Sequence, residues 1–529
     1  MRIDKVFVKD YKNLKDFYIE LDKDEMKAVL LGQNATGKSN FMEALILIFK
    51  YLDLSSDTKR EVPPFDYNIA YKIGGRTIDI TVEKGNYVIL VDTEKIKSFK
   101  SFFSKEGKCL YQPKYVFTYY SGLSNKLKEH FWHHQNKFYE RIISDNFQED
   151  ELDSLRKLFY VQLVHSYFVL LAYFTYEERE CIKFLNDVLN IQDVESVLFI
   201  LKKPKWADNG LKKNPDDIFW TAKGLVRPFL EKLWDLSIAP IYHHKKVQTD
   251  FDEYDPQDQL YLYLKGKDSL KELAKTYTNN TALFKALEST YISKLISEVK
   301  IRVRKKGIDG SITFKELSEG EQQLLTVLGL LRFTKDEDSL ILLDEPDTHL
   351  NPVWKWRYLE FLEDVVKRPD TTQIIINTHD PLVIGNLKKE EVRLFQNTED
   401  GKIKIEQPNV DPRGLGVEGI LTSELFGLPT TISEYTQSIL DKRNKLLIKQ
   451  QEGKLTDEEQ ESLRLSYVEL ESLGFSNTFR DPLYQKFIVA YKSRLKEEAS
   501  AFPYSKEDLE KQNKMALEIL EELSNEDNL

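Results

Sequence analysis

Eight consecutive residues, Gly32-Gln-Asn-Ala-Thr-Gly37-Lys38-Ser39, have the types and spacing of a loop that holds phosphate groups. The glycines let the backbone approach a phosphate, while the loop amides and the positive end of a following helix supply donors. The Lys38 ammonium group would reach the outer phosphates, and the Ser39 hydroxyl would take a Mg²⁺ position. The predicted nucleotide-binding residues are Gly32, Asn34, Ala35, Thr36, Gly37, Lys38, Ser39 and Asn40.

A second chemical signal is a pair of carboxylates at the end of an apolar run, Ser339-Leu-Ile-Leu-Leu-Asp344-Glu345-Pro346. Acidic residues at the carboxyl end of a buried strand lie where open α/β sheets bind their ligands. We expect Asp344 to hold Mg²⁺ through water, opposite Ser39. We expect Glu345 to orient or deprotonate the water that attacks in phosphoryl transfer. The alternative is an ordinary strand followed by an acidic turn.

A third signal, Leu317-Ser318-Glu319-Gly320-Glu321-Gln322, precedes an apolar helical pattern. Ser318 fits an N-cap, and Glu321 follows three residues later, as in a capping box. A purely structural role would explain that pair. Gly320 and the helix N-terminus would also form an anion site that is able to contact a γ-phosphate.

The fourth signal is a strand that ends in a histidine, Ile374-Ile-Ile-Asn-Thr-His379. A lone histidine at a strand end is more often structural than catalytic. If this strand lies beside the Asp344 strand, however, His379 can reach a γ-phosphate and sense its loss.

These residues need a sheet to position them, and the sequence predicts one. Residues 28–31 form an apolar strand before the phosphate loop, and residues 41–49 form an apolar helix after it. Residues 339–344, 373–377 and 392–395 are short apolar strands separated by helical patterns, which is typical of parallel βαβ units. Alternating segments near the N-terminus, with a hairpin turn at Gly74-Gly75, predict an antiparallel sheet in the first lobe.

The remaining segments are predicted to be mainly helical. We expect a first lobe with the phosphate loop and the antiparallel sheet over residues 1–122, and a compact helical insert without sustained heptads over residues 123–299. A second lobe follows over residues 300–408, beginning with a hairpin turned at Gly307-Ile-Asp-Gly310. Residues 409–529 are expected to form a helical C-terminal region, with a charged helical hairpin from Ile432 to Leu473 as a candidate partner dock.

Composition is consistent with a soluble protein of two or three domains. Of 529 residues, 41% are hydrophobic and 31% charged, and no apolar run approaches the ~20 residues of a membrane span. The start at Met1 leads directly into a strand, and the two cysteines give no disulfide framework, so we expect a cytoplasmic protein without membrane contact. The net charge of −11 argues against a wholly basic nucleic-acid-binding surface but leaves a local basic groove open.

The four signals stand in the order found in ABC-type ATPases of the SMC, RecF and OLD group, which the chain resembles. Asp347-Thr-His-Leu-Asn-Pro352 is similar to the D-loop of that group, and Tyr11-Lys-Asn-Leu14 to its N-terminal motif. The resemblance covers residues 1–120 and 300–405. It implies an α/β P-loop head with a mixed sheet and two lobes.

The resemblance also implies how such a head would work. Two ATP molecules would bind between two heads, so the protein would form a homodimer or a higher even oligomer. Ser318, Gly320 and Glu321 would contact the partner's ATP in trans. Glu345 and His379 would be catalytic, Asp347 would belong to the D-loop, and ATP and Mg²⁺ would be the cofactors. Gln112 is a weak candidate for the glutamine loop and is not counted as a site residue.

More narrowly, three segments resemble bacterial antiphage-defence ATPases of the Septu type, some of which act within retrons. These segments are Tyr119-Tyr-Ser-Gly122, residues 198–204 and residues 414–427. The implied function is an ATPase that regulates a separately encoded HNH nuclease. The alternatives are a RecF- or SMC-like repair ATPase that binds DNA, and an ATP-binding scaffold with little turnover. No acidic cluster after residue 400 resembles a Toprim nuclease centre.

Two further groups of residues leave alternatives open. His130, His133 and His134 have helical spacing suited to a metal, although an ordinary aromatic and polar helix face explains them better. The basic runs at residues 202–205 and 302–306 would suit DNA or RNA phosphates, although charge runs are usually just solvated.

Overall fold

The fold is described from a computed structural model. It describes residues 1–56, 59–96, 102, 111–122, 126–142, 157–208, 217–248, 250–308, 310–333, 338–366, 370–398, 400–451, 453–473, 487 and 513–520. These residues fall into two compact units, Met1–Asn409 and Val410–Leu529. The two units are described separately.

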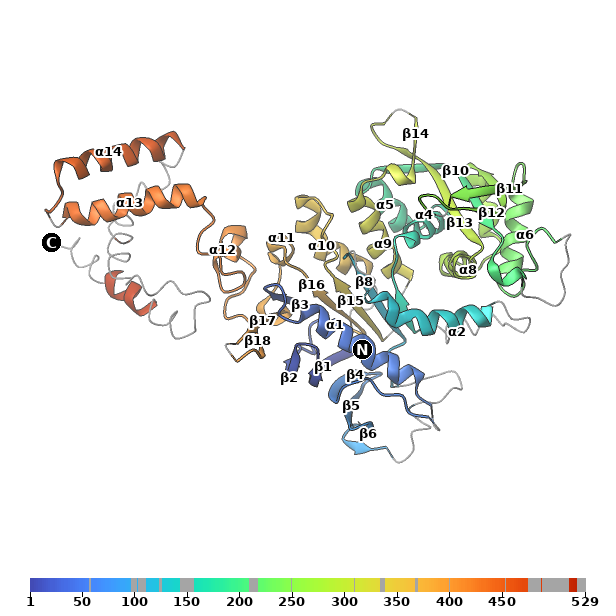
Figure 1. Cartoon of the computed structure of the whole chain (residues 1–529), viewed down its shortest axis with the longest axis horizontal. Helices are drawn as coiled ribbons and strands as arrows, with labels where there is room; N and C mark the ends of the chain where they lie inside the picture. Colours follow the sequence, from blue (N-terminus) through green and yellow to red (C-terminus); the bar gives the residue numbers. More distant parts are fainter. Residues whose placement is uncertain are drawn as a thin grey trace. The chain divides into compact units, whose positions relative to one another are not determined.

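The centre of the first unit is a mostly parallel sheet (Figure 1). The residues predicted to bind nucleotide and to act in catalysis follow the ends of its strands. In order across the sheet, its strands are β18 (Ile403–Glu406), β17 (Val392–Asn397), β3 (Lys27–Gly32), β16 (Thr372–Asn377), β15 (Ser339–Asp344), β8 (Tyr115–Tyr120) and β9 (Leu158–Tyr160). Every residue of β15 and β16 is buried, as expected for central strands covered on both faces. The predicted neighbours β15 and β16 are indeed parallel and pair Asp344 with Asn377.

The predicted antiparallel sheet of the first lobe is also present. Its strands, in order, are β2 (Leu14–Glu20), β1 (Arg2–Tyr11), β4 (Tyr67–Ile73), β5 (Arg76–Glu83), β6 (Asn86–Val91) and β7 (Glu94–Lys95). Helix α1 (Lys38–Leu54) contributes most of its side chains to one core with apolar residues from both sheets. The helix that follows the phosphate loop is therefore fixed by packing on two sides.

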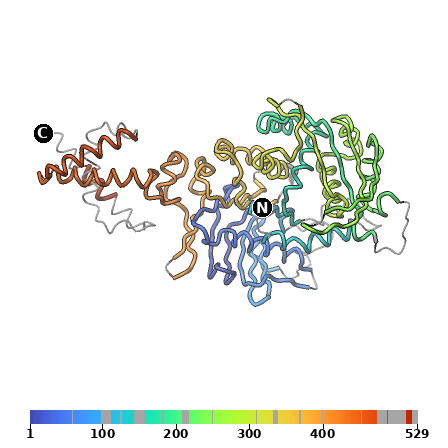
Figure 2. Tube along the Cα trace, turned by 45° about the horizontal axis from the view of Figure 1, so that its top comes forward, coloured from blue at the N-terminus to red at the C-terminus, as the bar shows by residue number. Residues whose placement is uncertain are grey.

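The insert differs from its prediction, because it is not purely helical. Its helices are α2 (Trp132–Ile142), α4 (Val164–Tyr176), α5 (Arg179–Asp187), α6 (Val226–Leu236), α7 (Gly266–Ala274) and α8 (Asn280–Ile292). They accompany an antiparallel sheet in the order β11 (Ile241–Gln248), β12 (Tyr254–Lys265), β10 (Ile191–Lys202), β13 (Ile296–Lys305) and β14 (Ser311–Thr313). Figure 1 shows these strands, in green and yellow, beside the helices of the insert, and Figure 2 traces the same segments from another side.

The prediction failed here because the apolar residues Val197–Leu201 of β10 form a short run that fits a helix as well as a strand. The partners of β10 are β12 and β13, which follow it far along the chain, so no local hairpin signal marked the pairing. The predicted hairpin turned at Gly307–Gly310 exists as β13 and β14, but it belongs to the sheet of the insert and not to the ATPase sheet.

Helices α9 (Glu319–Phe333), α10 (Pro352–Val365) and α11 (Pro381–Ile384) complete the ATPase part of the first unit. The second unit contains α12 (Gly416–Thr422), α13 (Glu434–Gln451) and α14 (Asp457–Ser472). The last two form the predicted hairpin and bury Ile439, Leu440 and Leu470 between them. Most of the expected helical tail lies outside the described residues. No helix among the described residues combines the length and apolar character needed to cross a membrane.

Candidate nucleotide site

The phosphate loop turns sharply into helix α1 at Gly37. Gly37 has φ 90°, a left-handed conformation that side chains disfavour, and helix α1 begins at the next residue, Lys38. A Cβ atom at Gly37 would also lie only 2.7 Å from the Cδ1 atom of Ile403. The left-handed turn therefore favours glycine, while the contact with Ile403 involves only the end of a flexible side chain.

The Lys38 ammonium group folds back over the loop. Its Nζ atom donates to the carbonyl oxygens of Gly32 at 2.7 Å and Gln33 at 2.9 Å, and lies 3.3 Å from Thr36 Oγ1. Burial lowers the pKa of Lys38 to about 8, although the negative charges of Asp344 and Glu345 oppose that shift. The cation is thus held at the loop, where outer phosphates would lie.

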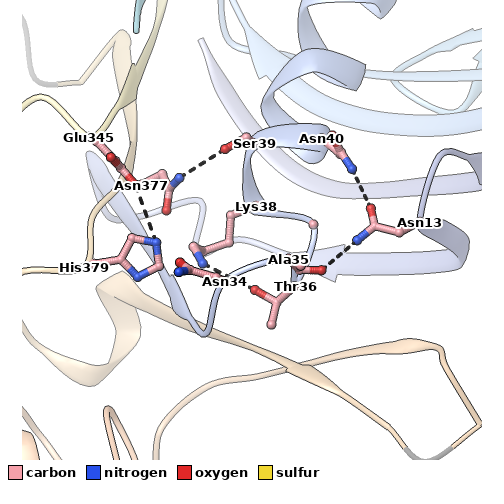
Figure 3. A pocket seen from close by; sticks show the side chains of 11 residues that line it. Asn13, Asn34, Ala35, Thr36, Lys38, Ser39, Asn40, Glu345, Asn377 and His379 are labelled. Carbon is pink, nitrogen blue, oxygen red and sulfur yellow. Dashed lines mark hydrogen bonds and ion pairs between the residues drawn. The ribbon is translucent and has the colours of Figure 1, made fainter. Parts of the chain in front are cut away.

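A cavity of about 380 Å³ lies over the loop and brings together segments far apart in the sequence (Figure 3). It is lined by Asn13, Asn34, Ala35, Thr36, Gly37, Lys38, Ser39, Asn40, Glu345, Asn377 and His379. Seven of the eight predicted loop residues are in this lining. Gly32 is not, and it contributes its carbonyl oxygen to Lys38 instead.

The predicted catalytic pair lies on the wall of the cavity opposite the loop. The Nε2 atom of His379 is 3.6 Å from the Oε1 atom of Glu345. Burial, followed by the charge of Lys38, lowers the pKa of His379 to about 4, so its imidazole is neutral at physiological pH. Glu345 has φ 51°, an uncommon conformation for a residue with a side chain, and its amide donates to Asn377 O at 2.8 Å.

Asp344 lies behind the cavity lining and reaches it through Asn377. The Asn377 amide nitrogen donates to Asp344 Oδ1 and lies 3.5 Å from Ser39 Oγ. Burial raises the pKa of Asp344, while contacts with Asn377 and Ser39 lower it. The other carboxylate oxygen, Oδ2, is buried and has no hydrogen-bond partner among the described residues. Such an oxygen is a donor atom suited to a hard cation.

The third predicted motif, called the signature here (Ser318, Gly320 and Glu321), lies at the start of α9 and does not line this cavity. The Ser318 hydroxyl and Glu321 form the predicted capping box, in which the Ser318 amide donates to Glu321 Oε2 at 2.9 Å. Glu321 also pairs with Lys305 of β13. Ser318 itself is exposed, so its hydroxyl is accessible at the surface.

Gly320 marks a close approach between α9 and the segment that resembles a D-loop. A Cβ atom at Gly320 would lie 2.5 Å from the carbonyl oxygen of His349, which is a backbone atom. Within that segment Asp347 is buried, and its Oδ2 atom accepts a hydrogen bond from Thr378 Oγ1 at 3.0 Å. The two motifs therefore form one packed structure.

The AAA ATPase domain family matches residues 1–384, which span both the phosphate loop and the catalytic pair. The chain belongs to this family. The prediction of an ATPase is thereby confirmed, as is the predicted likeness to the Septu and retron group, for which named relatives are found.

A Septu protein PtuA from Bacillus mycoides (strain KBAB4) is 27% identical to this ATPase over 216 residues, or 39% of this chain and 29% of the relative. The retron Vc95 probable ATPase from Vibrio cholerae serotype O1 biovar El Tor is 22% identical over 494 residues, or 85% and 84%. The chain thus spans less than a third of the PtuA relative. What that whole protein does remains a proposal for this chain.

Among solved structures, the SMC head domain from Thermotoga maritima matches with a TM-score of 0.31 and 13% identity. The match covers 78% of this chain and 100% of that chain. A TM-score this low does not support an inference from that structure to this chain. The predicted α/β class of the ATPase is established by its own sheets.

Two site residues of this ATPase were missed from the sequence. Asn377 lies in the predicted strand that leads to His379, and no role was predicted for it. Its side chain nevertheless connects Ser39 with Asp344. Asn13 accepts a hydrogen bond from Asn40 Nδ2 at 2.7 Å and donates to the Ala35 carbonyl at 3.0 Å (Figure 3). The only signal for Asn13 was its place in the N-terminal motif Tyr11–Leu14.

The histidines with metal-ligand spacing, for which an ordinary helix face was the favoured explanation, have other partners. His130 Nε2 lies 2.9 Å from Glu43 Oε1, and His134 Nε2 lies 3.0 Å from Asp53 Oδ2. Within the part of the chain that the structure describes, no group of three or more metal-ligating side chains is found. Gln112 is buried, and its amide donates to Leu52 O at 3.3 Å, away from the cavity.

Proposed function

We propose that this ATPase hydrolyses ATP with Mg²⁺ between two copies of the chain, and that its nucleotide state regulates a separately encoded nuclease in antiphage defence. The observation that carries the catalytic part is the cavity in which Lys38, Glu345 and His379 meet. These groups supply, in order, a phosphate ligand, a base for water and a neutral donor for a phosphate oxygen.

Mg²⁺ fits two neighbouring residues, Ser39 in the cavity lining and Asp344 behind it. The Ser39 hydroxyl and the unpartnered Oδ2 atom of Asp344 are oxygen donors, and Asn377 lies between their side chains. Hard cations prefer such ligands. When bound, Mg²⁺ would neutralise charge on the transferring phosphate.

Assembly between two heads is supported by the position of the signature. Ser318 and Gly320 lie outside the cavity of their own chain, and Ser318 is exposed. A second copy would bring its signature helix to the open side of the site. Asp347 would act at the same interface as the D-loop residue.

A complementation experiment tests this assembly. Lys38→Ala removes a phosphate ligand, and Ser318→Arg blocks the signature, so each variant alone should be inactive. If the signature works in trans, mixing the two variants restores one complete site per mixed dimer, and ATP hydrolysis returns. A mixture that stays inactive while both variants still associate, as measured by light scattering, contradicts the proposal.

Regulation of a nuclease follows from the resemblance to Septu-type defence ATPases, and the relatives found carry Septu and retron names. The test is to express the chain with an HNH reading frame encoded beside it and to count phage plaques. We expect protection only when both proteins are present, and we expect Glu345→Gln to alter it. Protection by the chain alone would contradict a separately encoded effector.

A second candidate is direct DNA binding, favoured by one strand of the insert. Lys300, Arg302 and Arg304 are all exposed on the same face of β13. A row of cations at this spacing suits a phosphate backbone. Salt-dependent binding of duplex DNA that is lost in Arg302→Ala/Arg304→Ala would favour this candidate.

A further inference from the structure

The five-stranded sheet of the insert has one face that is packed into a core. Val197 of β10 lies in register between Leu264 of β12 and Ile301 of β13, and all three side chains are at most 1% exposed. On the same face Phe199 meets Phe229 of α6, with ring centroids 6.3 Å apart. Side chains alternate between the two faces along each strand, so the residues in between belong to the other face.

We call that other face the open face, and the strand register assigns its residues. Ser196 of β10 lies between Lys265 of β12 and Arg302 of β13. Two residues on, Leu198 lies beside Lys300. Cross-strand partners share a face. Followed along the strands, this pattern puts six cationic side chains on the open face: Lys202, Lys245, Lys265, Lys300, Arg302 and Arg304.

The positive charge of the open face is only partly neutralised. Within the described strands, the register places three carboxylates there: Asp193, Asp255 and Glu298. Glu298 is paired with Lys315 and lies 3.6 Å from Lys300. Among the described residues, no ion pair within 4.0 Å involves the other cations of this face, which are Lys202, Lys245, Lys265, Arg302 and Arg304. A surplus of cations on a chain whose net charge is −11 selects an anionic partner by charge complementarity.

An exposed aromatic ring lies among these cations. Tyr263 is 40% exposed and lies two residues from Lys265 on β12. Leu198 of β10 separates it from Lys300 of β13. Residues two apart on one strand are about 7 Å apart. A ring at this distance from cationic groups suits a base whose phosphates contact those cations.

The neighbouring tyrosine of the open face is already engaged. The Lys245 Nζ atom lies 5.5 Å from the centroid of the Tyr261 ring, and the Tyr261 hydroxyl donates to Gln259 Oε1 at 2.7 Å. Tyr263 is therefore the ring of this pair that a ligand can reach.

The exposed ring distinguishes between anionic partners. An acidic peptide or a lipid headgroup would contact the cations and leave the ring of Tyr263 without a flat partner. In a duplex the faces of the bases are covered by their stacked neighbours, so a base must be unpaired to stack on a tyrosine. The combination of cations and an exposed ring therefore favours a single strand.

We propose that the open face binds single-stranded nucleic acid, DNA or RNA. An unpaired base stacks on Tyr263, and phosphates contact Lys265, Lys300, Arg302 and Arg304. The proposal rests on the second candidate function above, direct DNA binding, and adds to it the strandedness of the ligand and the contribution of β12. The open face shares no residue with the lining of the nucleotide cavity.

Binding is tested on the full-length protein by fluorescence anisotropy. The probes are a labelled single-stranded DNA of about 20 nucleotides, an RNA of the same sequence and the corresponding DNA duplex. We expect a single strand to bind at least tenfold more tightly than the duplex. Tyr263→Ala should weaken single-strand binding at least fivefold, because it removes the stacking ring, and Tyr263→Phe should keep the wild-type affinity.

The matched control for the ring is Tyr254→Ala. Tyr254 is also exposed on β12, but the alternation of side chains puts it on the opposite face of the sheet. This variant should bind the single strand as tightly as the wild type. Should Tyr263→Ala fail to fold, Tyr263→Leu replaces it, since leucine keeps an apolar side chain without a ring, and the same loss is expected.

The cations are tested by the salt dependence of binding. Arg302→Ala/Arg304→Ala should weaken single-strand binding and reduce the slope of log Kd against log salt concentration by about 1.4, because each phosphate contact contributes about 0.7. The control is Lys442→Ala/Lys445→Ala, which removes two exposed cations from α13. It should leave the affinity and the slope unchanged.

The outcomes separate this proposal from the functions proposed above. Preference for the DNA or the RNA strand, with the loss in Tyr263→Ala, supports the proposal and identifies the sugar that is accepted. A duplex that binds as tightly as the single strand, or an affinity that Tyr263→Ala leaves unchanged, overturns it, even if binding still depends on Arg302 and Arg304 and so retains the second candidate. If no probe binds at low salt, both fail, whereas ATP hydrolysis between two copies is tested separately by complementation.

Discussion

The imidazole Nε2 atom of His379 lies 3.6 Å from the Oε1 atom of Glu345, although the two residues follow different strands. The pairing explains this: β15 and β16 are parallel, with Asp344 opposite Asn377, so the residues that follow both strands leave the sheet at the same edge. The low pKa of His379, about 4, keeps its imidazole neutral beside this carboxylate. The pair can therefore combine a base with a neutral donor.

We predict that Glu345→Gln binds ATP but hydrolyses it at least 100-fold more slowly. The amide has nearly the same shape as the carboxylate but cannot accept a proton, and general base catalysis contributes about 10²–10⁴-fold. Single-turnover hydrolysis, with ATP binding measured in parallel, checks this. Glu360→Gln is the control because Glu360 is exposed on α10, and it should behave as the wild type. Normal turnover by Glu345→Gln would remove the catalytic assignment of Glu345.

The pKa of Lys38, which burial lowers to about 8, predicts a pH dependence of ATP binding. Above this pKa the ammonium group loses its proton and no longer attracts phosphates. If only the protonated form binds, the dissociation constant for ATP should be about tenfold higher at pH 9 than at pH 7.

Lys38→Arg provides the control for this measurement, because arginine stays charged throughout the range. Its affinity for ATP can be lower overall but should be the same at pH 7 and pH 9. The affinities of both proteins can be measured by fluorescence titration with a nucleotide analogue at several pH values. A wild-type affinity that does not change up to pH 9.5 would contradict the lowered pKa.

Local sequence patterns were enough to predict the central strands of the ATPase sheet, but not its edge strands β9 and β18. The centres of these strands, residues 340–343 and 374–376, are apolar, and complete burial of central parallel strands produces such runs. The phosphate loop could be predicted equally well, since its glycines and Lys38 follow a fixed spacing. Both signals lie within a few consecutive residues.

Long-range pairing and polar contacts were harder to predict. The sheet of the insert depends on β10 pairing with β12 and β13, and local periodicity carries no information about distant partners. Asn377 and Asn13 acquire their roles only when separate elements meet, in contacts with Asp344 and Asn40. The sequence motifs identified the catalytic and nucleotide-binding side chains, but they did not identify the side-chain amides of Asn377 and Asn13 that hydrogen-bond to neighbouring site residues.

Gly320→Ala is predicted to lower both stability and ATP hydrolysis. The new Cβ atom would meet the His349 carbonyl oxygen at 2.5 Å, so the D-loop segment or α9 must move. Overpacking of this kind costs about 1–3 kcal/mol. Thermal unfolding and steady-state hydrolysis are the measurements.

Gly419→Ala in helix α12 is the matched control, because its new Cβ atom would approach only the side chain of Leu415. Alanine in a helix is favoured over glycine by up to about 1 kcal/mol, which opposes the cost of a 3.1 Å contact with the Leu415 Cβ atom, so this variant should lose less stability than Gly320→Ala. If Gly320→Ala also keeps its stability and full hydrolysis, the close approach to His349 does not constrain the signature helix.

The buried carboxylate of Asp347 predicts a stability that depends on pH. Burial is the largest cause that raises its pKa from 3.8 to about 6, against a hydrogen bond from Thr378. Between these two values the folded protein binds more protons than the unfolded chain, so stability falls as the pH rises through this window. Above pH 6 the folded protein holds an unfavourable charge.

Asp347→Asn removes that charge and keeps the side-chain shape and an acceptor for Thr378. At pH 7.5 it should raise the free energy of unfolding by up to about 3 kcal/mol, and the gain should shrink toward zero near pH 4. Denaturant unfolding at both pH values measures this, with the exposed Asp364→Asn as control. A gain of the same size at both pH values would show that ionisation of Asp347 is not its cause. Loss of hydrolysis together with the gain would indicate that this carboxylate is retained for the D-loop at a cost in stability.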